Sequence, residues 1–188
     1  IGFHGQTVAH APDEGWTWQV GDGAALAHAI NRAVVWDFRS ADMVAGGEGA
    51  PFAPAYHWAL ARYIAAKEPV AFLNLGGVGN ITWVDPQAVT PEQDGALIAF
   101  DTGPANVLMD YWIAKHQQKN YDKNGDWAAS GNIDQALLKL LLDESYFAKG
   151  TPKSTGRELF NGPWLEEKLQ KLDQELEPED VQATLLRF

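Results

Sequence analysis

Cysteine is absent from this 188-residue chain, which excludes disulfide bonds and thiolate–zinc sites. No apolar run approaches the ~20 residues that a membrane-spanning helix needs, and no signal-peptide pattern opens the chain. Basic residues are few, since 14 Lys and Arg stand against 25 Asp and Glu, and the net charge is -11. Binding to a phosphate backbone needs clustered Lys and Arg, so nucleic acid is a poor partner. We expect a cytoplasmic protein that binds neither membrane nor nucleic acid.

The composition, with 46% hydrophobic and 21% charged residues, is typical of a globular protein. The length allows one ordinary domain or two small ones. Ile1 falls within an expected strand and Phe188 within an expected helix, so we expect a fragment of a longer protein.

The hydrophobic pattern predicts an α/β fold in two parts, residues 1–68 and residues 69–188. The order strand, strand, strand, helix from residue 70 is the opening order of a ribonuclease-H-like domain, although many α/β folds begin this way. Ser40 is expected to cap a short helix. The expected strands are 1–8, 16–20, 33–38, 70–75, 80–84 and 96–100, and the expected helices are 24–31, 40–44, 56–67, 104–116, 133–142, 164–172 and 178–188.

The sharpest local pattern is AFDTGPAN at residues 99–106, where an apolar strand ends in Asp101 and a helix is expected at once. Ligands of open α/β sheets bind beyond the strand ends, and amides from Thr102 to Ala105 could face a phosphate. Asp101 could accept a proton from an attacking hydroxyl or water, or position Mg²⁺ through water. Asp101 or Thr102 as a plain helix cap fits the pattern equally well.

A second segment, NLGGVGN at residues 74–80, places Gly76, Gly77 and Asn80 around an expected hairpin turn. Glycine lets a backbone approach a ligand closely, and Asn can orient hydroxyls or phosphates. The same turn also forms without any ligand. No Gly-Lys-Ser/Thr follows, so this is not a Walker A sequence.

Polar residues near two strand ends suit a sugar pocket, where several hydroxyls need partners. His4 and Gln6 belong to the first such group, and Asp37 and Arg39 to the second, with a glycine loop at residues 46–49. His4 as an ordinary core histidine is the competing interpretation.

Arg157 lies in the basic loop KSTGRE at residues 153–158 and could contact an anionic substrate group. A solvated loop is the more common outcome for such a segment. The five His residues show no metal-ligand spacing.

Five segments together resemble one family, the anhydro-N-acetylmuramic acid kinases. They follow the family's order and extend over nearly the whole chain, so the set is far more specific than any one member. The segments are GFHGQT at residues 2–7, DFRSADMVAGGEGAPFAPAYH at 37–57, NLGGVGNIT at 74–82, AFDTGPANVLMDYW at 99–112 and PKSTGRELFN at 152–161.

The resemblance implies an actin-like ATPase fold of two ribonuclease-H-like lobes, with ATP and sugar meeting in the cleft between them. It also implies that ATP phosphorylates O6 of 1,6-anhydro-N-acetylmuramic acid while water opens the anhydro bridge. The product is N-acetylmuramic acid 6-phosphate, an intermediate of cytoplasmic peptidoglycan recycling. The family aspartate that activates the water falls on Asp101.

The resemblance further implies ATP with its Mg²⁺ as cofactors, no metal held directly by side chains, and a homodimer. The remaining site residues fall into two groups. The expected sugar-binding residues are His4, Gln6, Asp37, Arg39 and Arg157, and the expected nucleotide phosphate-binding residues are Gly76, Gly77, Asn80, Thr102, Gly103 and Asn106.

The family's N-terminal phosphate-binding loop and its glycine-rich adenosine-binding segment are not found in residues 1–188. We therefore expect this chain to hold only part of an ATP site. Two alternatives remain open. One is a related kinase for a simple hexose or amino sugar, because pockets for different pyranoses use the same residue types. The other is a non-catalytic sugar-binding remnant.

Overall fold

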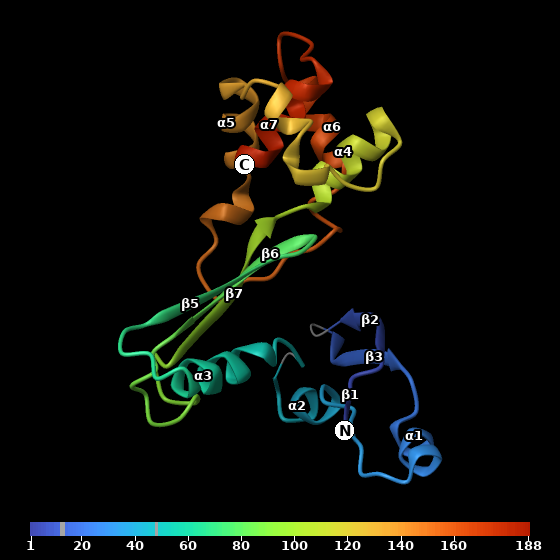
Figure 1. Cartoon of the computed structure of the whole chain (residues 1–188), viewed down its shortest axis with the longest axis vertical. Coiled ribbons are helices and arrows are strands. Elements are labelled where there is room, and N and C mark those ends of the chain that lie inside the picture. The colour runs from blue at the N-terminus through green and yellow to red at the C-terminus, as the bar shows by residue number, and fades with distance from the viewer. Residues whose placement is uncertain (12–13, 48) are drawn as a thin grey trace. The chain divides into compact units, whose positions relative to one another are not determined.

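The computed structural model describes residues 1–11, 14–47 and 49–188, and Glu48 of the predicted glycine loop lies outside these ranges. The chain forms two compact units, Ile1–Tyr56 and His57–Phe188. Each unit mixes helices and strands (Figure 1), which confirms the α/β class. The division into lobes at residues 68 and 69 stays a prediction. None of the described helices has the length and apolarity that crossing a bilayer requires.

The first unit is built from short elements. Strand β1 (Gly2–Phe3) pairs in parallel with β4 (Val35–Trp36), and β2 (Gln6–Ala11) pairs antiparallel with β3 (Trp16–Val20). The helices are α1 (Gly23–Ile30), α2 (Ser40–Val44) and α3 (Ala53–Tyr63), which continues into the second unit.

Three expectations for this unit are wrong in detail. The strand expected over residues 1–8 is broken at Gly5, which has a φ of +70° that other residues rarely adopt. The buried strand expected over residues 33–38 is only β4, and its Val35 is 63% exposed because β4 pairs only with the equally short β1. Ser40 is not a cap, since α2 begins after Arg39 and the Ser40 hydroxyl donates to Asp37.

The second unit opens with an antiparallel sheet in the order β5-β6-β7, made of β5 (Val70–Leu75), β6 (Val78–Val84) and β7 (Leu97–Pro104). The expected hairpin of residues 70–84 is confirmed by the pairing of Val70 with Val84 through Leu75 with Gly79. Strand β7 continues to Pro104, so the helix expected from residue 104 begins later, as α4 (Val107–Gln117).

The helices that follow the sheet in the chain gather beyond one of its ends (Figure 1). After α4 come α5 (Gln135–Leu142), α6 (Gly162–Gln170) and α7 (Pro178–Arg187), with short 3-10 turns η2 (Lys123–Gly125), η3 (Ala128–Ser130) and η4 (Ser145–Ala148) between them. Asp134 caps α5 and Asn161 caps α6, each through a side-chain oxygen that accepts a backbone N–H.

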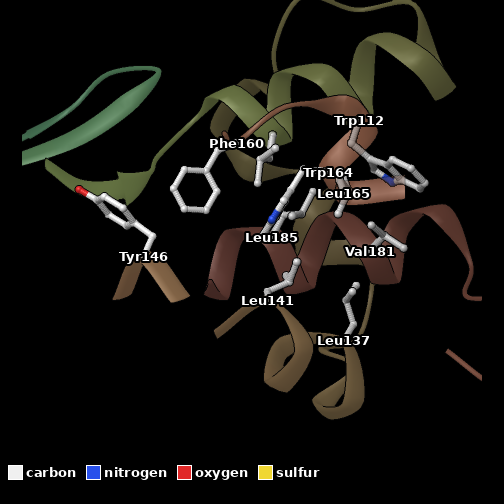
Figure 2. Close-up of a cluster of buried hydrophobic side chains, with 10 residues drawn as sticks. Trp112, Leu137, Leu141, Tyr146, Phe160, Trp164, Leu165, Val181 and Leu185 are labelled. Atoms are coloured by element: carbon white, nitrogen blue, oxygen red, sulfur yellow. The ribbon is translucent and has the colours of Figure 1, made fainter. Parts of the chain in front are cut away.

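A single hydrophobic core fills the space between these helices (Figure 2). Leu137 and Leu141 are fully buried in it, as the helical spacing predicts, while Leu140 is half-buried. Tyr146 lies at the border of the core, with its hydroxyl oxygen directed away from the other labelled side chains (Figure 2). The remaining buried members are Leu108, Trp112, Phe160, Trp164, Leu165, Val181 and Leu185.

Candidate active site

Asp101 lies inside β7 rather than at its end, opposite Asn80 of β6. The pairing then skips a residue, because Gly79 stands opposite Gly103 and leaves Thr102 as the extra residue of a β-bulge. Bulges are frequent next to active sites, where they change the direction of a side chain. In an antiparallel ladder, residues directly opposite each other share a face, so the side chains of Asn80 and Asp101 lie on the same face of the sheet.

The Asp101 carboxylate is half-buried and held at one oxygen. Its Oδ2 accepts a hydrogen bond from the Thr155 amide at 2.9 Å, while Oδ1 has no partner among the described residues. Burial raises the pKa of Asp101, the Thr155 amide opposes this, and the charge of Glu158 adds to the rise. A carboxylate with a raised pKa is a better proton acceptor near neutral pH.

The helix-cap interpretation of this motif is wrong. The N-cap residue of α4 is Asn106, and neither Asp101 nor Thr102 makes a capping bond. Instead, carbonyls of the hairpin turn meet the start of α4: Gly77 accepts from the amides of Ala105 (3.0 Å) and Val107 (3.2 Å). The Ala105 amide is therefore engaged within the chain, and the sequence did not indicate this.

Asn106 fastens the glycine turn to the same helix. Its side-chain amide donates to the carbonyls of Leu75 (3.1 Å) and Gly76 (2.9 Å), and its backbone amide also donates to Gly76 (2.9 Å). In the first turn of α4, the amides of Leu108 and Met109 form no hydrogen bond within the described residues. Leu108 is buried in the core, so only the Met109 N–H, at the positive end of the α4 dipole, is left for an anion.

Arg157 lies beside this turn. A Cβ on Gly77 would stand only 3.7 Å from Arg157 Nη2. Burial raises the pKa of Asp110, and the nearby charge of Arg157 offsets part of this rise. A Cβ on Gly79 would come within 2.6 Å of Thr102 Oγ1. The two glycines therefore leave room for neighbouring polar groups, and neither has the positive φ that many tight turns require.

The predicted sugar-binding residues of the first unit are partly brought together. Arg39 donates to His4 Nε2 at 2.8 Å and to the Gly49 carbonyl at 2.5 Å, and its guanidinium lies 5.8 Å from the centroid of the Phe52 ring. His4 is exposed, so its interpretation as a core histidine is wrong. Asp37 is also exposed and accepts from the Ser40 hydroxyl at 2.6 Å. Gln6, in contrast, directs its amide to the carbonyl of the adjacent Thr7.

Three residues around Asp101 escaped sequence reasoning. The hydroxyl of Tyr146 donates to the Asp101 carbonyl at 2.6 Å, the Asp101 amide donates to the Lys153 carbonyl at 3.0 Å, and the Thr155 amide holds the carboxylate. The basic pattern of the loop at residues 153–158 indicates only Arg157. Since the side-chain contacts join residues 45 and 54 positions apart in the sequence, no local spacing could have indicated them.

Other candidate features lie away from these residues. A cavity of 480 Å³ borders Trp112, Glu166 and Val181, and none of the predicted site residues lines it. Among the described residues, no group of three or more His, Asp or Glu side chains is placed to hold a metal ion.

The similarity to known proteins covers the whole chain. The model of the family described as anhydro-N-acetylmuramic acid kinase matches residues 1–188. Proteins named anhydro-N-acetylmuramic acid kinase are similar at 52% identity in Ruegeria sp. (98% of this chain, 48% of the relative), 48% in Pseudomonas savastanoi pv. phaseolicola (100% and 49%) and 49% in Pasteurella multocida (100% and 48%). The chain spans about half the length of these curated relatives. It belongs to the anhydro-N-acetylmuramic acid kinase family.

Proposed function

We propose that this chain forms part of an ATP-dependent kinase that converts 1,6-anhydro-N-acetylmuramic acid and water to N-acetylmuramic acid 6-phosphate. Family membership and the relatives' names support this reaction. The observation that carries the chemistry is the Asp101 carboxylate, held at Oδ2 by Thr155 and unpartnered at Oδ1 within the described residues. The same proposal includes an actin-like ATPase fold, a cytoplasmic location and a homodimer.

In this mechanism Asp101 is the general base. Its Oδ1 takes a proton from water as the water oxygen bonds to the anomeric carbon of the sugar. The bond between that carbon and O6 breaks, and O6 then attacks the γ-phosphoryl group of ATP, with ADP as the leaving group. A single carboxylate suffices because the leaving oxygen of the first step is the nucleophile of the second.

The nucleotide phosphates are assigned to the turn and helix start beside Asp101. The Met109 amide, which has no hydrogen-bond partner among the described residues, suits an anionic oxygen. Gly76, Gly77, Asn80, Thr102, Gly103 and Asn106 shape this region. Mg²⁺ commonly keeps several waters while it binds phosphate oxygens, and the half-buried Asp101 carboxylate could hold the ion through one of those waters. When bound, the ion would offset charge on the transferred phosphoryl group.

The sugar is assigned to His4, Gln6, Asp37 and Arg39, with Arg157 as the partner of its lactyl carboxylate. Replacing Arg157 by Ala in the full-length kinase that contains this sequence should separate two roles. A higher KM for the sugar with an unchanged KM for ATP indicates the carboxylate, and the reverse indicates a phosphate. If both KM values stay unchanged, Arg157 is not a site residue.

The decisive test of the function is Asp101→Asn in the full-length kinase, with Asp143→Asn at an exposed position as the matched control. A base role predicts a fall in kcat of about 10²–10⁴-fold with a modest change in KM. Burial raises the pKa of Asp101, so the ionised carboxylate destabilises the folded state. The neutral Asn side chain should therefore leave Tm unchanged or raise it. Full turnover by Asp101→Asn would refute the proposed mechanism.

Substrate choice is tested separately by measuring ADP release from the full-length kinase. We expect release with the anhydro sugar and none with N-acetylglucosamine. A preference for the simple amino sugar would favour a related hexose-type kinase, and binding of sugar without ADP release would favour a non-catalytic remnant.

A further inference from the structure

Asp101 lies on the outer edge of the sheet, because β7 is the last strand in the order β5-β6-β7. Its amide donates to the Lys153 carbonyl (3.0 Å) and its carbonyl accepts from the Tyr146 hydroxyl (2.6 Å). Both main-chain groups therefore point away from β6, and Asp101 forms a non-hydrogen-bonded pair with Asn80. Edge strands normally leave such groups to water or to another strand. Here a phenol and one loop carbonyl take that place.

Lys153 ties these partners to each other. Its ammonium donates to the carbonyls of Tyr146 (3.2 Å) and Phe147 (3.3 Å) and lies 4.8 Å from the centroid of the Tyr146 ring. Its own carbonyl holds the Asp101 amide. Tyr146, Lys153 and Asp101 thus form a closed ring of contacts, and the Thr155 amide adds the bond to the carboxylate.

Tyr146 joins this ring to the rigid part of the unit. The residue is 1% exposed, and its ring packs edge-on against Phe147 and Phe160, with ring centroids 5.9 and 5.7 Å apart. Figure 2 shows it at the border of the core, with its oxygen directed outwards. Burial, followed by the charge of Asp101, raises the pKa of Tyr146 to about 12, so the hydroxyl stays a donor at physiological pH.

We propose that Tyr146 is a positioning residue for the Asp101 carboxylate, which it holds in place through the main-chain carbonyl of Asp101. This inference rests on the proposed function. A general base must stay within a fraction of an ångström of its working position, and main chain at a bulged sheet edge lacks the ladder that would otherwise hold it. The phenol couples that main chain to a close-packed core, which resists displacement.

The test is Tyr146→Phe in the full-length kinase, which keeps the packed ring and removes only the hydroxyl. Tyr111→Phe is the matched control, because the Tyr111 hydroxyl donates to Glu166 (3.1 Å) away from Asp101. We expect kcat to fall about 10-fold in Tyr146→Phe, with both KM values within about twofold of wild type. The acid limb of the pH profile should move to higher pH, because a loosened Asp101 loses the Thr155 bond that lowers its pKa.

Two results would overturn the inference. One is a Tyr146→Phe enzyme whose kcat and acid limb are the same as those of the control, Tyr111→Phe. The other is a loss of activity that follows only the folded fraction, with an unmoved acid limb, since that describes a core residue. Wild-type turnover of the anhydro sugar tests the proposed function on its own. If wild type is inactive, carboxyl NMR titration of Asp101 in both proteins decides the positioning role, and equal pKa values refute it.

Discussion

Glu144 is expected to be a main acid-sensitive group of the second unit. Its Oε2 accepts from Trp164 Nε1 (2.9 Å) and lies 3.2 Å from Lys168 Nζ, and its Oε1 accepts from the Ser145 hydroxyl (3.1 Å). Its side chain is 15% exposed, so solvent screens these contacts little. The Trp164 hydrogen bond first, and then Lys168 and Ser145, lower the pKa of Glu144 from 4.5 to about 2, against the opposing effect of burial.

The sign and size follow by linkage. The pKa of Glu144 is lower in the folded than in the unfolded chain, so its ionised form stabilises the fold above pH 4.5, and this stabilisation is lost as the pH falls from 4.5 towards 2. A depression of this size corresponds to about 3 kcal/mol of unfolding free energy. Since Gln keeps the shape but does not titrate, Glu144→Gln should be less stable than wild type by up to that amount at pH 7.

The assay is urea denaturation of the chain followed by far-UV circular dichroism, from pH 7 to pH 2.5. The free-energy gap between wild type and Glu144→Gln should close across the acid range. Glu167→Gln is the control, because Glu167 forms an exposed ion pair with Lys171 (2.7 Å), and such pairs contribute little. A gap that stays constant with pH, or a Glu144 pKa near 4.5 by NMR, would refute the reasoning.

Two further substitutions probe the surroundings of Asp101. Gly79→Ala places a Cβ 2.6 Å from Thr102 Oγ1, so it should disturb the bulge and lower both Tm and turnover, whereas Gly76→Ala meets nothing closer than 3.6 Å and should leave Tm unchanged. Equal thermal melts for the two variants would contradict this. The buried Thr155 hydroxyl has no hydrogen-bond partner in the described residues, so Thr155→Val should leave the unfolding free energy unchanged or raise it by about 1 kcal/mol, and a clear loss in urea denaturation would show a partner for that hydroxyl.

The elements with a strong local pattern were predictable. The β5–β6 hairpin follows from the apolar run at residues 70–75 and the glycine turn after it, and α5 follows from the Leu137 and Leu141 spacing together with the Asp134 cap. The start of α4 was not predictable, because Pro104 suits a first helical turn but is instead held in β7 opposite Val78. Tertiary pairing decided the state of this residue.

The candidate site shows the same division. Asp101 and the glycine turn stood out because their residue types are informative within a few positions. The residues that hold Asp101 did not, since Tyr146 and Lys153 are ordinary members of a helical turn and a polar loop. Their role depends on which groups the sheet edge leaves unpaired, and only the three-dimensional structure gives this.

The bulge at Thr102 also decides which face of the sheet the later side chains of β7 occupy. Side chains alternate between faces with a period of two, so one extra residue reverses the assignment of everything that follows. Asp101 shares a face with Asn80, whereas Gly103 is matched to Gly79 and so belongs to the opposite face. Removing Thr102 would therefore do more than delete a hydroxyl. It would rotate the junction to α4 relative to the carboxylate, which makes the length of this short segment as much a requirement as its composition.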